Sequence, residues 1–560
     1  MPEKIRIFCT DTGSCIDIDG GTTLGEIYEG IKEKIPFSPI CAHVNNHTEG
    51  LSFPVYAPKT VTFLDASTPP GERVYTRSLC MILYKAVYDS FPGLRLRIEH
   101  SVSGGLYCRL LTEKGETYVP SHEQTEMLLR RMKEIVAADY PFVRKERRTE
   151  DVKRLFSRQG LDDKVLLLDT LHQLYTQYYM LDNIADSYYG ALAPSSGHIG
   201  VFDLIRYKKG MLLLGPDPKD RSMPRKPVVQ EKMYAAFTDY LKFNRIIRVS
   251  DVGELNTAVQ ERKTVDLINV AEAMHDKYLG KIADEIARLH RENGTSIVLI
   301  AGPSSSGKTT TAKRLGIHLM TNLLVPKTIS LDDYFVDRKH TPLDESGDYD
   351  YESLYALDLG LFNEQLNALL AGETVNLPTY SFEFGKRVER KRPLSLKPDE
   401  ILVIEGIHGL NPELTRNIPQ EKIFKVYVSA LTTLSIDSHN WIPTSDNRLL
   451  RRIVRDYKYR HTSAEETIRR WPSVRRGEEK WIFPFQENAD ATFNSSLIFE
   501  LGVMKDFAVP VLRNVPHDRK EFAEAYRLLR FLDCFHPIPA DQIPANSLLR
   551  EFLGGSAFRY

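Results

Sequence analysis

The sequence predicts an α/β protein whose C-terminal half is built on a parallel sheet and whose N-terminal half holds two smaller α+β domains. From residue 296 onward, short apolar runs alternate with helical patterns, which is typical of βαβ units. The first of these runs ends in a glycine-rich loop that leads into an amphipathic helix. Before residue 215, strand and helix patterns mix without this alternation, as in α+β domains. The length of 560 residues also exceeds what one hydrophobic core usually spans.

The first predicted domain covers residues 1–66. Residues 4–9 and 15–18 alternate between apolar and polar side chains, as strands do. A helix is expected from residue 24 to about residue 34, where Pro36 stops it.

The second predicted domain covers residues 72–215 and follows the sequence Pro69-Pro70-Gly71, which we interpret as a boundary. Its patterns predict helices at 79–88 and 123–138, and strands near 94–99 and 106–111.

A linker and one helix are expected over residues 216–295. Residues 215–228 are rich in proline and charge, and an apolar helical stripe follows over 265–292. The parallel-sheet domain is expected over 296–505. A helical tail should follow over 506–560, with a helix near 520–532 and proline-rich sequence after it.

The composition is that of an ordinary globular protein, with 42% hydrophobic and 27% charged residues. The formal net charge of −1 gives no global attraction to nucleic acid or to an anionic membrane. No apolar run approaches the roughly 20 residues that span a bilayer, and no apolar signal segment opens the chain.

The six cysteines form no CxxC pair, so neither a zinc ribbon nor a disulfide framework is expected. We expect a reduced cytoplasmic protein without a membrane partner.

The glycine-rich loop, residues 302–309, matches the pattern GxxxxGK[ST] at every fixed position. Gly302 and Gly307 permit backbone angles that turn N–H groups toward a phosphate. Lys308 would reach the β- and γ-phosphates, and the Thr309 hydroxyl would bind Mg²⁺. We therefore expect ATP and Mg²⁺ as cofactors. The residues expected to bind the phosphates are Gly302, Ser304, Ser305, Ser306, Gly307, Lys308, Thr309 and Thr310.

Two acids stand at the ends of later strands. Asp332 follows the strand-like residues 328–331, and a carboxylate there could accept the proton of an acceptor hydroxyl; a turn or a helix cap is the alternative. Glu405 follows residues 401–404, where it could hold Mg²⁺ or simply end a strand.

Residues 448–476 hold nine arginines and one lysine against three acids. The arginines at 448, 451, 452 and 455 recur at helical spacing and form one positive helix face. A solvated face, an RNA-binding patch and a lid over a triphosphate are the three interpretations. The phosphate-binding loop favours the lid, with Arg451 and Arg455 as cations that act on the transferred group.

Together these motifs resemble the uridine kinase and phosphoribulokinase family over about residues 296–497. The resemblance places the catalytic aspartate of the sequence Ser330-Leu-Asp-Asp-Tyr-Phe at Asp332. It implies that Tyr349 and Asp350 hold a ribose, that Tyr380 contacts the nucleoside, and that Glu405 lies on the metal side. We also expect Arg387 to bind the acceptor, as a residue that could take over reading of the base. Residues 451–456 resemble the lid of the family, and Ala489-Asp490 resembles its later Ala-Asp pair.

The sequence departs from the family at three places. The family has a histidine where this chain has Gly385, and a glutamine where it has Arg470. The usual Glu-Arg-Gly-Arg appears as Tyr-Arg-His-Thr at residues 459–462. These changes concern base recognition rather than phosphate chemistry.

The N-terminal half resembles threonyl-tRNA synthetase, with residues 1–66 similar to its TGS domain and residues 72–215 similar to its editing domain. The best-matching stretches are residues 131–135, 140–146 and 194–197. The editing signatures are degenerate: both histidines of His-Ser-x-x-His are lost at 77–81, and the Cys and His of Asp-Leu-Cys-Arg-Gly-Pro-His are lost at 186–192. The resemblance implies contact with tRNA without editing catalysis.

The expected function is transfer of the ATP γ-phosphoryl group to the 5′-hydroxyl of a nucleoside. Two alternatives stay open: the same chemistry on a sugar-phosphate or vitamin-precursor hydroxyl, and an ATP-switched regulator that binds tRNA. An editing hydrolase is disfavoured by the lost residues. Assembly as a homo-oligomer also stays open.

Overall fold

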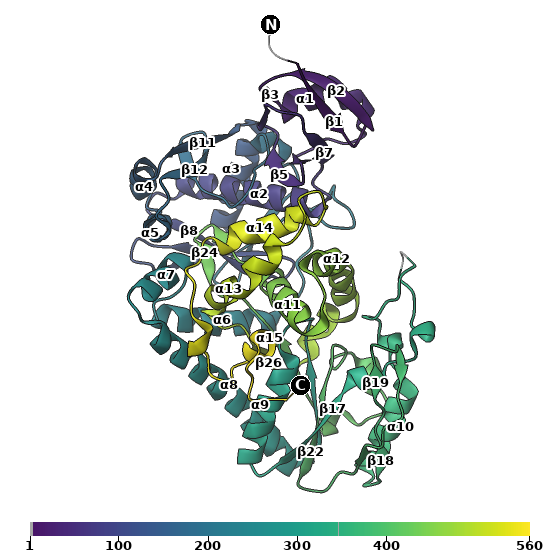
Figure 1. The fold of residues 1–560 in the computed structure, drawn as a ribbon. Coiled ribbons are helices and arrows are strands. Elements are labelled where there is room, and N and C mark those ends of the chain that lie inside the picture. Colours follow the sequence, from purple (N-terminus) through teal and green to yellow (C-terminus); the bar gives the residue numbers. More distant parts are fainter. Residues whose placement is uncertain (1–3, 345–346, 560) are drawn as a thin grey trace.

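The computed structural model describes residues 4–344 and 347–559. Figure 1 shows the N-terminal sheet at one end of an elongated molecule, with strands β17 and β22 near the other end. Among the described residues, no helix has both the length and the apolar content that crossing a membrane requires.

The first unit is a five-stranded sheet with one helix against it. The sheet has the order β2-β1-β7-β4-β5 and is built from β1 (Lys4–Cys9), β2 (Ser14–Asp19), β4 (Cys41–Val44), β5 (His47–Gly50) and β7 (Thr60–Leu64). Helix α1 (Leu24–Ile31) begins at a capping box between Thr23 and Glu26. Leu24 and Ile27 pack its buried face against the sheet.

The second unit begins with α2 (Pro69–Ser90), which starts earlier than the expected helix at 79–88. The hydroxyl of Thr68 accepts from Gly71 N at 3.2 Å and caps the helix. The prolines that we interpreted as a boundary stand at the first helical positions, where proline is favoured.

Two sheets and three more helices complete the second unit. The larger sheet has the order β10-β9-β15-β14, with β8 paired to β9, and the smaller has the order β11-β12-β13. Helix α3 covers residues close to the expected 123–138. The elements are β8 (Arg95–Val102), β9 (Gly105–Leu111), β10 (Thr117–Tyr118), α3 (His122–Ala137), β11 (Phe142–Arg148), α4 (Thr149–Arg158), α5 (Asp162–Leu171), β12 (Tyr175–Leu181), β13 (Ile184–Asp186), β14 (Asp203–Tyr207) and β15 (Gly210–Leu214).

Three helices, rather than one, lie between the second unit and the parallel sheet. The expected helix at 265–292 is α8 (Thr264–Asn293), and it is preceded by α6 (Glu231–Ile246) and α7 (Val252–Gln260). Met233, Phe237 and Leu241 are buried at four-residue spacing along α6, a helical stripe that the linker interpretation overlooked.

The core of the C-terminal half is the predicted parallel sheet. Its order is β17-β22-β16-β23-β26, and every pair in it is parallel. The strands are β16 (Ile297–Ala301), β17 (Val325–Ser330), β22 (Glu400–Glu405), β23 (Ile423–Ser429) and β26 (Ala491–Asn494). Ser330 and Ile300 both stand opposite Glu405 in the register, so the carboxyl ends of these strands meet at one edge. Ligands bind at this edge in open α/β sheets.

The sheet is covered by helices on both faces. Helices α8 and α9 (Lys308–Thr321) pack on one face, and α10 (Leu359–Leu370) packs on the other. Helices α11 (Thr444–Arg460), α12 (Ala464–Trp481) and α13 (Glu500–Arg513) share the hydrophobic core of the side that holds α8 and α9. After α14 (Phe522–Leu532), the chain returns to the parallel sheet and ends near α15 (Arg550–Leu553), coloured yellow beside α11 and β26 in Figure 1.

A buried polar network joins the two halves of the chain. Lys164 Nζ of α5 lies 2.9 Å from an oxygen of Asp186 and 2.8 Å from one of Asp437, and all three side chains are nearly inaccessible. Asp437 belongs to a hairpin of the C-terminal half, β24 (Ser435–Asp437) and β25 (Asn440–Trp441). Because an unpaired buried charge is costly, each half depends on the other to satisfy this network.

Candidate active site

The phosphate-binding motif lies between the central strand β16 and helix α9. A Cβ on Gly302 would stand 1.9 Å from the carbonyl oxygen of Val428, so only glycine fits there. Gly307 has a φ of +85° and Ser305 a φ of +58°, both in the left-handed region. The hydroxyls of Ser305 and Ser306 are buried and have no hydrogen-bond partner among the described residues. The loop thus offers oriented polar groups to an anion.

Lys308 begins α9 and folds back over the loop. Its Nζ donates to the carbonyl oxygens of Gly302 at 3.0 Å and Pro303 at 3.1 Å. Burial lowers the pKa of Lys308, and the negative charges of Glu405 and Asp332 act against this effect. The lysine, the two predicted acids and the loop therefore lie together.

Ser330, the last residue of β17, connects the two acids. Its hydroxyl donates to Glu405 Oε1 at 3.0 Å and accepts from Asp332 N at 3.3 Å. Burial and the nearby charge of Asp332 raise the pKa of Glu405 to about 7. Asp332 is exposed, yet desolvation by the protein atoms around it still raises its pKa, and Lys308 opposes this rise. Because the carboxylates of Asp332 and Glu405 repel each other, a cation bound between them would be stabilised.

Asp333, the neighbour of Asp332, has a different partner. Its Oδ2 accepts from Arg392 Nη1 at 2.7 Å. Asp333 thus belongs to an ion pair beside the site, while the charge of Asp332 interacts with that of Lys308.

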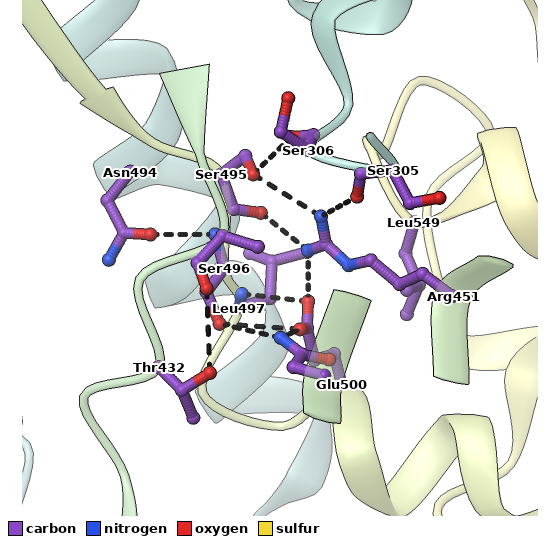
Figure 2. Close-up of polar contacts among 12 residues, drawn as sticks. Ser305, Ser306, Thr432, Arg451, Asn494, Ser495, Ser496, Leu497, Glu500 and Leu549 are labelled. Carbon is purple, nitrogen blue, oxygen red and sulfur yellow. Dashed lines mark hydrogen bonds and ion pairs between the residues drawn. The ribbon is translucent and has the colours of Figure 1, made fainter. Parts of the chain in front are cut away.

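Arg451 lies behind the phosphate-binding loop. Figure 2 shows it donating to the backbone oxygen of Ser495 at 2.9 Å and pairing with Glu500 at 2.5 Å. Its side chain is 0% exposed. Its Nη1 also donates to the Ser305 carbonyl oxygen at 3.4 Å, so Arg451 ties the loop to the segment after β26. This position does not fit the lid role that its helical spacing predicted.

Other arginines of α11 do face the site. Arg452 Nη1 donates to Ser304 Oγ at 2.7 Å. Arg455 and Arg460 both pair with Asp456, at 2.8 and 3.6 Å. Arg460 and Arg455 also limit the rise in the pKa of Asp332, which desolvation causes. Arg460 was missed by sequence reasoning because it lies in the segment that departs from the family pattern.

The predicted acceptor residues lie around an aromatic cluster. The ring centroid of Phe335 lies 5.6 Å from that of Tyr380 and 6.4 Å from that of Tyr351. The ring centroids of Tyr351 and Tyr349 are 6.0 Å apart. Tyr349 is 44% exposed and Tyr380 is 8% exposed, so one is free at the surface and the other is packed inside.

The polar acceptor residues already have partners within the protein. Asp350 Oδ1 accepts from Glu352 N at 3.2 Å, and its other oxygen has no hydrogen-bond partner among the described residues. Arg387 Nη2 donates to Asp358 Oδ2 at 3.1 Å and to the Tyr334 carbonyl at 3.2 Å. Arg387 therefore braces this loop region.

An arginine fills the space beside Gly385. A Cβ on Gly385 would lie 2.7 Å from Arg338 Nε, and Gly385 has a φ of +63°. Arg338 Nη2 donates to the Phe382 carbonyl at 2.7 Å. Arg470, the other departure from the family, is paired with Glu466 on the exposed surface of α12.

Two glutamates at the site were not predicted. Glu478 of α12 accepts from Ser304 N at 3.0 Å and pairs with the buried Arg448. Glu352 has a buried carboxylate oxygen with no partner among the described residues. Burial and Glu478 raise the pKa of Glu352 to about 7, against the charges of Arg452 and Lys308. No motif or spacing marks either residue.

The predicted metal residues suit Mg²⁺ in their chemistry. Glu405 supplies carboxylate oxygens and Thr309 a hydroxyl, and Mg²⁺ prefers oxygen ligands. The raised pKa of Glu405 reflects a buried acid next to Asp332, a setting that a cation would stabilise.

The comparisons with known proteins agree with these motifs. The model of the Phosphoribulokinase / Uridine kinase family matches residues 297–498. The uridine kinases of Staphylococcus aureus strains JH9 and Newman are each 30% identical over 197 residues, which cover 35% of this chain and 86% of each relative.

One solved structure, of a possible uridine kinase from Bacillus stearothermophilus, is 24% identical and covers 36% of this chain and 88% of that one. Its TM-score is 0.24, too low to support an argument about the fold. The match to the family model and the identity with the S. aureus enzymes carry the assignment. Through residues 297–498, the chain belongs to the phosphoribulokinase and uridine kinase family.

Proposed function

We propose that the protein transfers the γ-phosphoryl group of ATP to the 5′-hydroxyl of a nucleoside. Membership of the family supports a P-loop kinase that acts on a small-molecule hydroxyl. The observation that carries the proposal is the convergence of Lys308, Asp332 and Glu405 beside the phosphate-binding loop.

In this proposal, the chain positions the phosphates and the acceptor for an in-line transfer. The N–H groups of the loop and the Lys308 ammonium hold the phosphates. Arg452, Arg455 and Arg460 add positive charge on the side of α11. Such preorganised charge stabilises the transferring group without moving at the moment of reaction.

Asp332 is the proposed base. It orients the acceptor hydroxyl and accepts its proton, while Asp333 stays in its pair with Arg392. Thr309 and Glu405 would hold Mg²⁺. When bound, the ion neutralises negative charge on the phosphates.

The aromatic cluster is the proposed acceptor pocket. Tyr349 offers an exposed ring face to a base, and Tyr380 backs the pocket from inside by packing against Phe335. The remaining oxygen of Asp350 can accept from a ribose hydroxyl. A carboxylate that loses a hydroxyl partner is left unsatisfied, so ribose should be strongly preferred to deoxyribose. Because Gly385 removes an imidazole, discrimination between bases should be loose.

A phosphorylated sugar is the second candidate acceptor. The Arg338 guanidinium beside Tyr380 donates to a carbonyl and forms no ion pair with an acid among the described residues. Its charge is therefore available to a phosphate on the acceptor.

The test is a panel of acceptors with γ-labelled ATP. Ribonucleosides, their 2′-deoxy forms and sugar phosphates would be compared by kcat/KM. We expect ribonucleosides to exceed their 2′-deoxy forms by at least about a hundredfold. Turnover restricted to phosphorylated sugars would contradict the nucleoside proposal and favour the second candidate.

A further inference from the structure

The C-terminal tail of the chain packs directly against the phosphate-binding loop. Leu548, Leu549, Phe552 and Leu553 of the tail are at most 2% exposed. A Cβ on Gly307 would lie 2.6 Å from Leu548 Cδ2, so the tail touches the loop at its second glycine. The Phe552 ring also lies under Arg451, with 5.1 Å between the guanidinium carbon and the ring centroid. The tail is thus a fixed wall of the site.

The side chain of Glu551 extends from this wall onto the first turn of α9. Its Oε2 accepts from Thr310 Oγ1 at 2.5 Å and from Thr310 N at 3.2 Å. Thr310 is among the residues expected to bind the nucleotide phosphates. Thr310 stands directly after the motif, in the first turn of α9, where the helix N-terminus favours a negative group. A carboxylate oxygen therefore lies on a donor pair that we expect a phosphate oxygen to use.

Glu551 differs from the other acid that contacts the loop. Glu478 also accepts from a loop N–H, but Arg448 and Arg475 pair with it and balance its charge. In the described part of the chain, no cationic side chain forms an ion pair with Glu551. Its charge acts instead on Lys308 and Glu405 and raises the pKa of both. For Lys308 this opposes the larger effect of burial, and for Glu405 it adds to that effect.

We propose that Glu551 sets the nucleotide affinity of this kinase by occupying a phosphate position at Thr310. ATP must displace the carboxylate from Thr310 before its own phosphate can accept the same hydrogen bonds. This inference rests on the proposed function only in taking a nucleoside triphosphate as the ligand. Because Leu548 and Phe552 anchor the backbone, the displacement is a rotation of the Glu551 side chain.

A purely structural role for Glu551 makes a different prediction. An acid at a helix N-terminus stabilises the helix, and such a role alone would have no effect on nucleotide binding. Glu551→Gln separates the two roles, because the amide oxygen can still accept from Thr310 while the charge is gone. Truncation of the tail is less informative, since it would expose Leu548 and Phe552.

The experiment is a fluorescence titration of the full chain with a non-hydrolysable ATP analogue, without any acceptor. We expect Glu551→Gln to lower the Kd by at least about tenfold, because two negative groups a few ångströms apart repel strongly inside a protein. The matched control is Asp541→Asn, which makes the same charge change on an exposed part of the same tail. Its Kd should equal that of the wild type.

Three outcomes are decisive. A Kd for Glu551→Gln equal to or higher than that of the wild type would overturn the inference. Lys308→Ala shows whether the analogue binds at the loop, because loss of the lysine should weaken binding only there. If the analogue binds at the loop but the protein transfers no phosphoryl group, the proposed function is contradicted and this inference stands. If neither the wild type nor Glu551→Gln binds the analogue while both unfold like the control, both proposals fail.

Discussion

Asp332 and Asp333 are neighbours in the chain, yet their side chains have different partners. Asp333 is paired with Arg392, whereas Asp332 faces Lys308 and the arginines of α11. Both lie in a 3-10 turn, Leu331–Tyr334, that follows β17, and successive side chains of such a turn point in different directions. Because Asp333 is occupied by Arg392, Asp332 is the carboxylate that can bind the acceptor hydroxyl.

The two aspartates can be compared directly by mutation. We expect Asp332→Asn to lower kcat by about a hundredfold to ten-thousandfold, because a general base is lost. Binding of ATP should change little. Asp333→Asn should mainly weaken the Arg392 pair and affect stability. Steady-state kinetics on both variants checks this, and a larger loss of kcat in Asp333→Asn would refute the assignment.

Glu405 should make stability depend on pH. Its pKa in the folded protein is about 7, above that of an unfolded glutamate, because burial and Asp332 disfavour the charge. The folded state therefore holds its proton longer, and the stability that this proton contributes is lost as pH rises from about 4.5 to 7. Glu405→Gln should be more stable than the wild type at pH 8, by at most about 3 kcal/mol.

The measurement is thermal unfolding of both proteins at pH 5 and pH 8 with a metal chelator present. The difference in Tm should be small at pH 5 and larger at pH 8. Equal differences at the two pH values would show that Glu405 does not titrate in this range.

At the scale of elements, helix α11 carries two sets of arginines. Arg448 and Arg451 lie three residues apart and are buried against Glu478 and Glu500. Arg452 and Arg455 lie on the neighbouring face, toward Ser304 and Asp332. The helix therefore anchors the loop with one face and adds charge to the site with the other.

The two faces should respond differently to alanine. Arg451→Ala leaves Glu500 buried and unpaired, so we expect a loss of about 3–5 kcal/mol in the free energy of unfolding. Arg455→Ala leaves Asp456 its pairs with Arg452 and Arg460, so stability should fall much less, and kcat should fall because charge is lost from the site. Urea unfolding and kinetics on both variants provide the check. A stable Arg451→Ala variant with low kcat would restore the lid role of Arg451.

The sequence was informative where local patterns decide structure. The strand, loop and helix around Lys308 follow from apolar runs and fixed glycines, and a parallel sheet necessarily brings Asp332 and Glu405 to the same edge. The burial of Arg451 could not be predicted, because helical spacing groups arginines without showing which neighbour each one meets. Glu551 contacts Thr310 across 241 positions in the chain, and no motif marks that contact.

At the scale of the whole molecule, the N-terminal half is joined to the kinase region through buried charges. Lys164, Asp186 and Asp437 form one network across the two halves. His439 Nδ1 adds a contact of 2.7 Å with Asp186. The TGS-like and editing-like assignments, tRNA contact and self-assembly remain predictions. The network nevertheless indicates that experiments on this protein should use the full chain.

The central claim is phosphoryl transfer to a nucleoside by the loop at Lys308. The most direct measurement is ³¹P NMR of the products that the full chain forms from ATP, Mg²⁺ and a ribonucleoside, beside Lys308→Ala. The wild type should yield ADP and a nucleoside 5′-monophosphate in equal amounts, and Lys308→Ala should work at less than about a tenth of that rate. Absence of the 5′-monophosphate with every ribonucleoside, or its undiminished formation by Lys308→Ala, would contradict the claim.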